Sequence, residues 1–183
     1  MAELGHELLT ALAMAGRVCV GLIFLLAAMQ KAAHWRLLPG VIANYRLLPP
    51  ALVAPVAAAL PPVEMIVGIL VLSAQLRPFA ELTAIGLLIL FAAAMAVNLR
   101  RGRAHIDCGC NRPFLKQSLR WSLVARNAML AALLLPSLAT PGPAALSAIL
   151  TGATAGLAFF LLYLLLNTIS ALPRFERRGH RFA

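Results

Sequence analysis

Charged residues are scarce in this chain, and acidic ones more so. Of its 183 residues only 12% are charged and six are acidic, whereas 62% are hydrophobic. A soluble domain of this length is about one quarter charged, so the chain has too little polar surface to face water on all sides. No Ser/Gly-rich linker, low-complexity tract or internal repeat divides it. We therefore expect a single membrane domain over residues 1–183.

Long apolar runs replace the missing charges. Runs of about twenty apolar residues predict helices that cross a hydrocarbon layer about 30 Å thick. The first run follows acidic residues and lacks a small-residue cleavage site, unlike a cleavable signal peptide. We expect an all-α integral membrane protein, a bundle of four or five transmembrane helices embedded in the lipid bilayer. The spans are predicted at about residues 8–30, 51–75, 79–99, 121–137 and 144–168, followed by a basic tail at 169–183.

The net charge of +10 is concentrated in a few segments. In a soluble protein such a charge suggests nucleic acid as a partner. Here thirteen of the sixteen Lys and Arg residues lie between or after the spans, with three in 31–50, six in 100–120 and four in 169–183. Basic short loops mark the cytoplasmic side of a membrane protein. The pattern predicts a multi-pass protein of the bacterial inner membrane, with the N-terminus outside, the C-terminus in the cytoplasm and no nucleic-acid partner.

Two of the three cysteines lie one glycine apart, in Cys108-Gly109-Cys110. The reactive form of cysteine is the thiolate, which nearby cations favour. The basic segment 100–120 supplies such cations, opposed only by Asp107. A disulfide closed over one residue makes a tight ring, and strain makes such a bond easier to reduce. We therefore predict that Cys108 and Cys110 are a catalytic redox pair, without assigning which thiol attacks; a static reduced pair is the alternative on the cytoplasmic side.

Other roles for the cysteines remain open at this point. With His105, the pair offers three candidate ligands for a soft ion such as Cu(I), but a structural zinc site usually needs four ligands with wider spacing. No cofactor is required if the thiols themselves carry the electrons. Cys19 lies in the middle of the first span. It is either a small apolar packing residue or a relay that receives electrons from the Cys108–Cys110 segment.

Arg17 in the first span and Glu64 in the second break the apolar pattern. Counting inward from the same side of the membrane places both near its middle. An unpaired charge there is costly, so we expect a structural ion pair between them that braces two helices. A proton or quinone site is the alternative.

Three further polar residues are candidates for supporting roles. Arg126 and Asn127 lie about two turns into the fourth span. Arg126 either extends to the cytoplasmic interface or points to the thiol segment, where it favours a thiolate. Lys31, at the end of the first span, is an interface anchor or a second cation near that segment.

Several of these residues, together with others, form an ordered series that resembles a known family. In chain order they are Arg17, Lys31, Tyr45-Arg46-Leu47-Leu48-Pro49, Pro61, Glu64, Gly68, Arg101-Gly102, Asp107-Cys108-Gly109-Cys110, Trp121 and Arg126-Asn127. From about Gly16 to Leu135 the chain resembles the MauE family of methylamine-utilisation membrane proteins, within the wider DoxX-like group. The family usually follows its Cys-Gly-Cys with Phe-Gly, where this chain has Asn111-Arg112. This difference bears on the identity of the partner protein more than on the fold.

The resemblance implies a role in maturing methylamine dehydrogenase, whose small subunit is rich in disulfides. It also implies a thioredoxin-like partner on the outer side, whereas charge counting places the cysteines inside; a transmembrane thiol relay reconciles the two. We expect membrane thiol–disulfide electron transfer, the activity of a thiol–disulfide oxidoreductase. The alternatives are a non-catalytic assembly subunit or a soft-metal-binding membrane protein, and third a quinone-coupled membrane subunit.

Overall fold

The computed structural model describes residues 2–106, 118–139 and 145–171, and its regular elements there are α-helices. In chain order these are α1 (Ala2–Ala33), α2 (Leu38–Tyr45), α3 (Pro50–Ser73), α4 (Phe79–Arg100), α5 (Trp121–Leu133), α6 (Leu135–Ala139) and α7 (Leu146–Ala171). Within these described ranges, five stretches are long and apolar enough to cross a membrane, with α5 and α6 together forming the fourth. The expected all-α membrane bundle is confirmed; its Cys-Gly-Cys loop lies outside the described residues.

The helices follow the apolar runs closely, with one break. α3 continues through Pro55, Pro61 and Pro62, whereas the fourth span is interrupted at Leu134. Pro136 explains the break, because proline has no N–H to donate and its ring clashes with the carbonyl four residues earlier. The chain makes tighter bonds there, with the N–H of Leu134 donating to the carbonyl of Ala131 at 3.2 Å.

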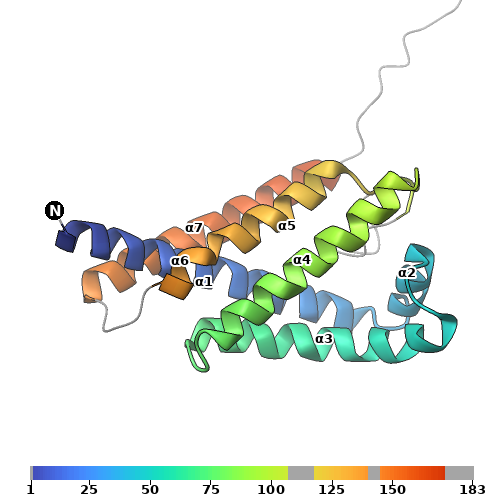
Figure 1. Ribbon diagram of the computed structural model, residues 1–183, viewed down its shortest axis with the longest axis horizontal. Helices are drawn as coiled ribbons and strands as arrows, with labels where there is room; N and C mark the ends of the chain where they lie inside the picture. Colours follow the sequence, from blue (N-terminus) through green and yellow to red (C-terminus); the bar gives the residue numbers. More distant parts are fainter. Residues whose placement is uncertain (1, 107–117, 140–144, 172–183) are drawn as a thin grey trace, which may run out of the picture.

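α1 is the central element of the bundle. It packs chiefly against α3 and α7, while α4 packs against α5 (Figure 1). The main core lies where these helices meet and is built from aliphatic and small side chains. Val20 of α1, Val71 of α3 and Leu134 are fully buried in it. This arrangement leaves most of α7 facing outward, as expected for a lipid-facing helix.

Small residues allow α1 and α7 to approach closely. A Cβ added at Gly156 would lie 2.6 Å from the carbonyl oxygen of Ala15, and one added at Gly152 would lie 2.5 Å from that of Ala11. The two glycines are four residues apart on one face of α7, the spacing typical of tight helix contacts in membranes. Glycine at these positions therefore sets the distance between the two helices.

α3 and α4 separate along their length. They are joined by a short turn and diverge from it, so that the end of α4 near Arg100 lies far from the start of α3 (Figure 1). The short helix α2 packs against α3 at this wider end. In the sequence, α2 is flanked by three basic residues: Lys31 and Arg36 precede it, and Arg46 follows it. We call this end of the bundle, which carries α2 and the residues flanking 107–117, the basic end.

Candidate functional site

The residues on either side of segment 107–117 are held together. Ile106 and Leu119 are buried, and the backbone N–H of Leu119 donates to the carbonyl of Ile106 at 3.2 Å. Both pack in a small apolar cluster with Met95 of α4 and Leu123 of α5. The chain therefore leaves the basic end and returns to it at one anchored point.

The predicted redox residues belong to that segment. Asp107, Cys108 and Cys110 lie outside the described residues. His105 is described and exposed. Within the described ranges no three His, Cys, Asp or Glu side chains are grouped so as to hold a metal ion. The redox pair and the alternative set of Cys108, Cys110 and His105 both stay predictions.

Asn98 organises the chain just before the thiol segment. Its side chain is fully buried, and its Nδ2 donates to the carbonyl of Ala94 at 3.1 Å. Arg103 closes the turn from the other side, because its backbone N–H reaches the Asn98 carbonyl at 3.0 Å and its Nη1 lies 3.4 Å from Asn98 Oδ1. Sequence reasoning missed Asn98; the available signal was an amide within the last turn of an apolar helix.

Arg126 points to α7. Its Nη1 donates to Asn167 Oδ1 at 2.7 Å, and its guanidinium carbon lies 5.2 Å from the centre of the Tyr163 ring. Neighbouring Asn127 is buried and donates to the carbonyl of Leu123 in its own helix, at 3.0 Å. The contacts of Arg126 join α5 to α7, whereas the bond of Asn127 stays within α5. A supporting role toward the thiols stays a prediction for both residues.

Cys19 lies in the main core. Only 1% of its surface is exposed, and it packs in the same cluster as Val20, Phe24 and Leu130. This environment suits a small apolar side chain. Its predicted participation in a relay depends on the two cysteines outside the described residues.

Lys31 and Glu64 form a buried ion pair between α1 and α3. Lys31 Nζ lies 2.8 Å from both carboxylate oxygens of Glu64. The Glu64 side chain is 1% exposed and that of Lys31 is 12% exposed. Lys31 is therefore neither a simple interface anchor nor an isolated cation, since it neutralises the carboxylate in the second span.

The predicted Arg17–Glu64 pair is wrong, and the offset between the helices explains why. Gly21 of α1 packs directly against Gly68 of α3, and Arg17 Nε donates to the carbonyl of Val71 at 3.1 Å. In this antiparallel register Glu64 lies level with a point about eight residues beyond Arg17. At about 1.5 Å per residue, the two levels are roughly 12 Å apart.

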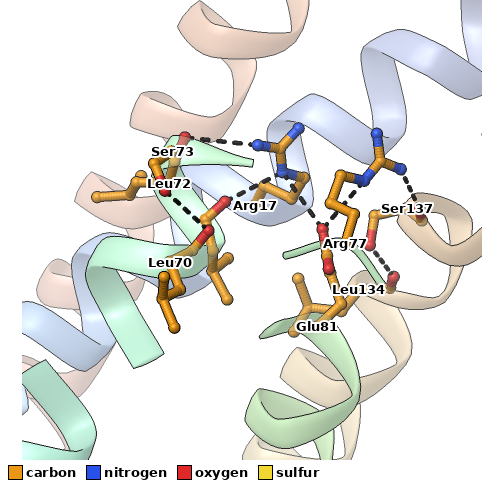
Figure 2. Close-up of polar contacts among 9 residues, drawn as sticks. Arg17, Leu70, Leu72, Ser73, Arg77, Glu81, Leu134 and Ser137 are labelled. Atoms are coloured by element: carbon orange, nitrogen blue, oxygen red, sulfur yellow. Dashed lines mark hydrogen bonds and ion pairs between the residues drawn. The ribbon is translucent and has the colours of Figure 1, made fainter. Parts of the chain in front are cut away.

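Arg17 pairs instead with Glu81, at the other end of the bundle. Its Nε lies 3.6 Å from Glu81 Oε1, and Arg77 Nε lies 3.3 Å from the same oxygen. Figure 2 shows the carboxylate between the two guanidinium groups. The Glu81 side chain is fully buried, whereas that of Arg77 is 29% exposed. One carboxylate thus compensates two cations, one deep in the bundle and one near its surface.

The same two arginines also satisfy backbone carbonyls. Arg17 donates to the carbonyls of Val71 and Leu72 in the last turn of α3, and Arg77 donates to the carbonyl of Ser137 in α6 (Figure 2). The last carbonyls of a helix lack partners within it. The Arg17–Glu81–Arg77 group therefore fastens the ends of α3 and α6 to α1 and α4. The sequence analysis did not single out Arg77 and Glu81; the available signal was a pair of opposite charges four residues apart at the edge of an apolar run.

Comparison with known proteins connects this architecture to a family. The family model described as "Methylamine utilisation protein MauE" matches residues 9–140. The chain belongs to the MauE family. The MauE protein of Paracoccus denitrificans is 43% identical over 160 residues, which cover 85% of this chain and 86% of that protein. The one from Paracoccus versutus is 38% identical over 157 residues, covering 82% and 83%. No solved structure matches.

The MauE match includes the site residues described above. It runs from α1 through α6 and so contains Lys31, Glu64, Glu81 and the Cys108–Cys110 segment. Another MauE protein, from Methylophilus methylotrophus, is 46% identical over 100 residues, which cover 55% of this chain and 53% of that protein. The chain is thus a MauE-family protein, and the part of it that the structure describes has five helices long and apolar enough to span a membrane.

Proposed function

We propose that this protein transfers electrons between thiols and disulfides at a membrane, through Cys108 and Cys110. The observation that carries the proposal is the sequence Cys108-Gly109-Cys110 within a segment whose flanks, Ile106 and Leu119, are buried and hydrogen-bonded to each other. A dithiol–disulfide pair on such a segment exchanges two electrons and two protons with the cysteine pair of a partner, through a mixed-disulfide intermediate. In either direction one pair is oxidised to a disulfide while the other is reduced to a dithiol.

The client and partner follow from the family. Its relatives carry the name methylamine utilisation protein. We propose that the client is a disulfide-containing protein, by resemblance the small subunit of methylamine dehydrogenase, and that the exchange partner is a thioredoxin-like protein. Arg126 and the basic residues of 100–120 favour the thiolate through their charge.

Replacing single cysteines by serine tests the proposed thiol chemistry. Cys108→Ser or Cys110→Ser abolishes client maturation while the helical bundle still folds, because one thiol cannot form the intramolecular bond. Each single-cysteine variant accumulates a mixed disulfide with its partner, visible on a non-reducing gel. Cys19→Ser is the matched control: full activity makes Cys19 a packing residue, and lost activity makes it part of a relay. Normal maturation by the Cys108→Ser, Cys110→Ser double variant refutes the proposal.

The orientation is part of the same proposal. Basic residues gather at the basic end, and the positive-inside rule assigns that end to the cytoplasm of the bacterial inner membrane, with the N-terminus outside. Reporter fusions after Arg103 and after Arg178 are expected to be active only as cytoplasmic reporters. If the reporters are instead active in the periplasm at both positions, the orientation is the opposite of the one proposed, and the thiols face the client directly.

A further inference from the structure

A cavity of about 360 Å³ lies between α2, α3 and α4, where α3 and α4 diverge. Small-molecule sites in proteins typically measure about 300–1,000 Å³. Its walls are almost wholly apolar and come from all three helices. The lining includes Leu38, Ile42, Tyr45, Leu60, Phe91 and Met95. Because α3 and α4 are predicted spans, the cavity is placed to receive a ligand that is dissolved in the membrane.

One charged side chain, Lys31, also lines the cavity. Its ammonium lies 2.8 Å from both oxygens of Glu64, so the pair as a whole is neutral. Its Nζ also lies 5.8 Å from the centre of the Phe91 ring, on the aromatic wall of the cavity. An ammonium carries three N–H donors. The two bonds to Glu64 leave a third donor for an acceptor in the cavity, and a buried donor without one is costly.

These features select the ligand. An anionic headgroup gains little here, because Glu64 already neutralises Lys31. A saturated acyl chain fits the apolar walls but offers no acceptor to the ammonium. A neutral ring with a carbonyl oxygen meets both requirements: it packs against apolar and aromatic side chains, and its oxygen accepts the remaining hydrogen bond. Among molecules dissolved in membranes, quinones have this chemistry.

We infer that the cavity between α2, α3 and α4 binds the ring of a membrane quinone, with a carbonyl oxygen accepting a hydrogen bond from Lys31 Nζ. Tyr45 and Met95 border the cavity and also pack in the cluster that anchors Ile106 and Leu119. The binding site therefore adjoins the anchored flanks of the thiol segment. The inference goes beyond the proposed thiol chemistry and needs none of the cysteines, so each can fail without the other.

The test is equilibrium binding of decylubiquinone to the purified full chain in detergent micelles, with protein-free micelles as the blank. We expect one saturable site per chain, unchanged when all three cysteines are replaced by serine. Ala94→Phe fills the cavity and lowers the affinity at least tenfold. Ala93→Phe is the matched control, because Ala93 is exposed on the same helix and does not line the cavity; it leaves the affinity within twofold.

The proposed hydrogen bond from Lys31 to the quinone is tested separately from the shape of the cavity. Replacing the pair together, as Lys31→Met with Glu64→Leu, is expected to lower decylubiquinone affinity about tenfold. Decylbenzene, which has the same tail and no carbonyl, is expected to compete at least tenfold more weakly than the quinone. Equal competition by decylbenzene overturns the inference, since the cavity is then a hydrocarbon slot.

Mapping by photolabelling keeps the inference testable even if a cavity-filling variant fails to fold. A photoreactive azidoquinone is bound to the wild-type protein, and the labelled peptides are identified by mass spectrometry. Labelling is expected within residues 38–48 and 90–95, and excess decylubiquinone is expected to prevent it. Absence of saturable binding above the micelle blank, or labelling confined to other segments, refutes the site.

Discussion

Removing one partner of the Lys31–Glu64 pair is expected to destabilise the bundle strongly. At 2.8 Å, two unit charges attract by roughly 6 kcal/mol if the effective dielectric constant is about 20. Desolvation offsets part of that attraction, and breaking a buried pair from one side costs about 3–5 kcal/mol. Because Glu64 is almost fully buried, we expect Lys31→Met to lower the free energy of unfolding by about this amount.

A double-mutant cycle isolates the interaction. Glu64→Leu alone leaves the ammonium unpaired, whereas the double variant leaves neither charge behind. The double variant is expected to lose at least about 2 kcal/mol less than the sum of the two single losses. The measurement is unfolding by sodium dodecyl sulfate in mixed micelles, followed by far-UV circular dichroism. Arg100→Met, an exposed site at the end of α4, is the control and is expected to change stability by less than about 0.5 kcal/mol.

The cycle also has an outcome that refutes the assigned pairing. Arg17→Met and Glu64→Leu change residues whose levels in the bundle are well separated. Their effects are expected to add to within about 0.5 kcal/mol. If Arg17 and Glu64 couple more strongly than Lys31 and Glu64 do, the register of α1 against α3 is wrong.

Two further predictions use the same unfolding assay. Glu81→Gln leaves Arg17 buried without a charge partner, so we expect a loss of about 3–5 kcal/mol; Arg77→Gln is expected to cost less, because Arg77 is partly exposed, and equal losses would contradict the buried site. Gly156→Ala forces a Cβ against backbone of α1 and is expected to cost about 1–3 kcal/mol. Gly86→Ala is its control, since nothing lies within 4 Å of the added Cβ, and a loss as large as that of Gly156→Ala would refute the close contact.

Hydropathy was enough to predict the helices but not their partners. A long apolar run can satisfy its backbone in lipid only as a helix, so the spans follow from composition. The pairing of charges depends on how far one helix is displaced along another. The contact of Gly21 with Gly68 sets that displacement, and a single sequence does not reveal it. Consequently Lys31 was interpreted as an interface anchor or a second cation near the thiol segment, and Arg17 was assigned the wrong carboxylate.

The position of a charge at the edge of an apolar run does not reveal whether it is buried. Glu81 is the third residue of α4 and lies four residues after Arg77, and nothing in the sequence marks its carboxylate as buried. The structure buries it because α1 presents Arg17 at that level. The apolar cavity was equally inaccessible to sequence reasoning, since it arises from the divergence of two helices whose individual sequences are simply hydrophobic.

The ion pairs that join α1 to α3 and α4 have a consequence for how the chain enters the membrane during synthesis. Both cations of α1, Arg17 and Lys31, emerge before the carboxylates that neutralise them, which belong to α3 and α4. On insertion scales a charge at mid-membrane costs about 2.5–3.5 kcal/mol, and less toward the end of a span, where Lys31 lies. The two cations of α1 are therefore only partly compensated when Glu64 arrives, and fully compensated only after Glu81. Insertion of these three helices is coupled, with each later segment retaining the earlier one in the bilayer.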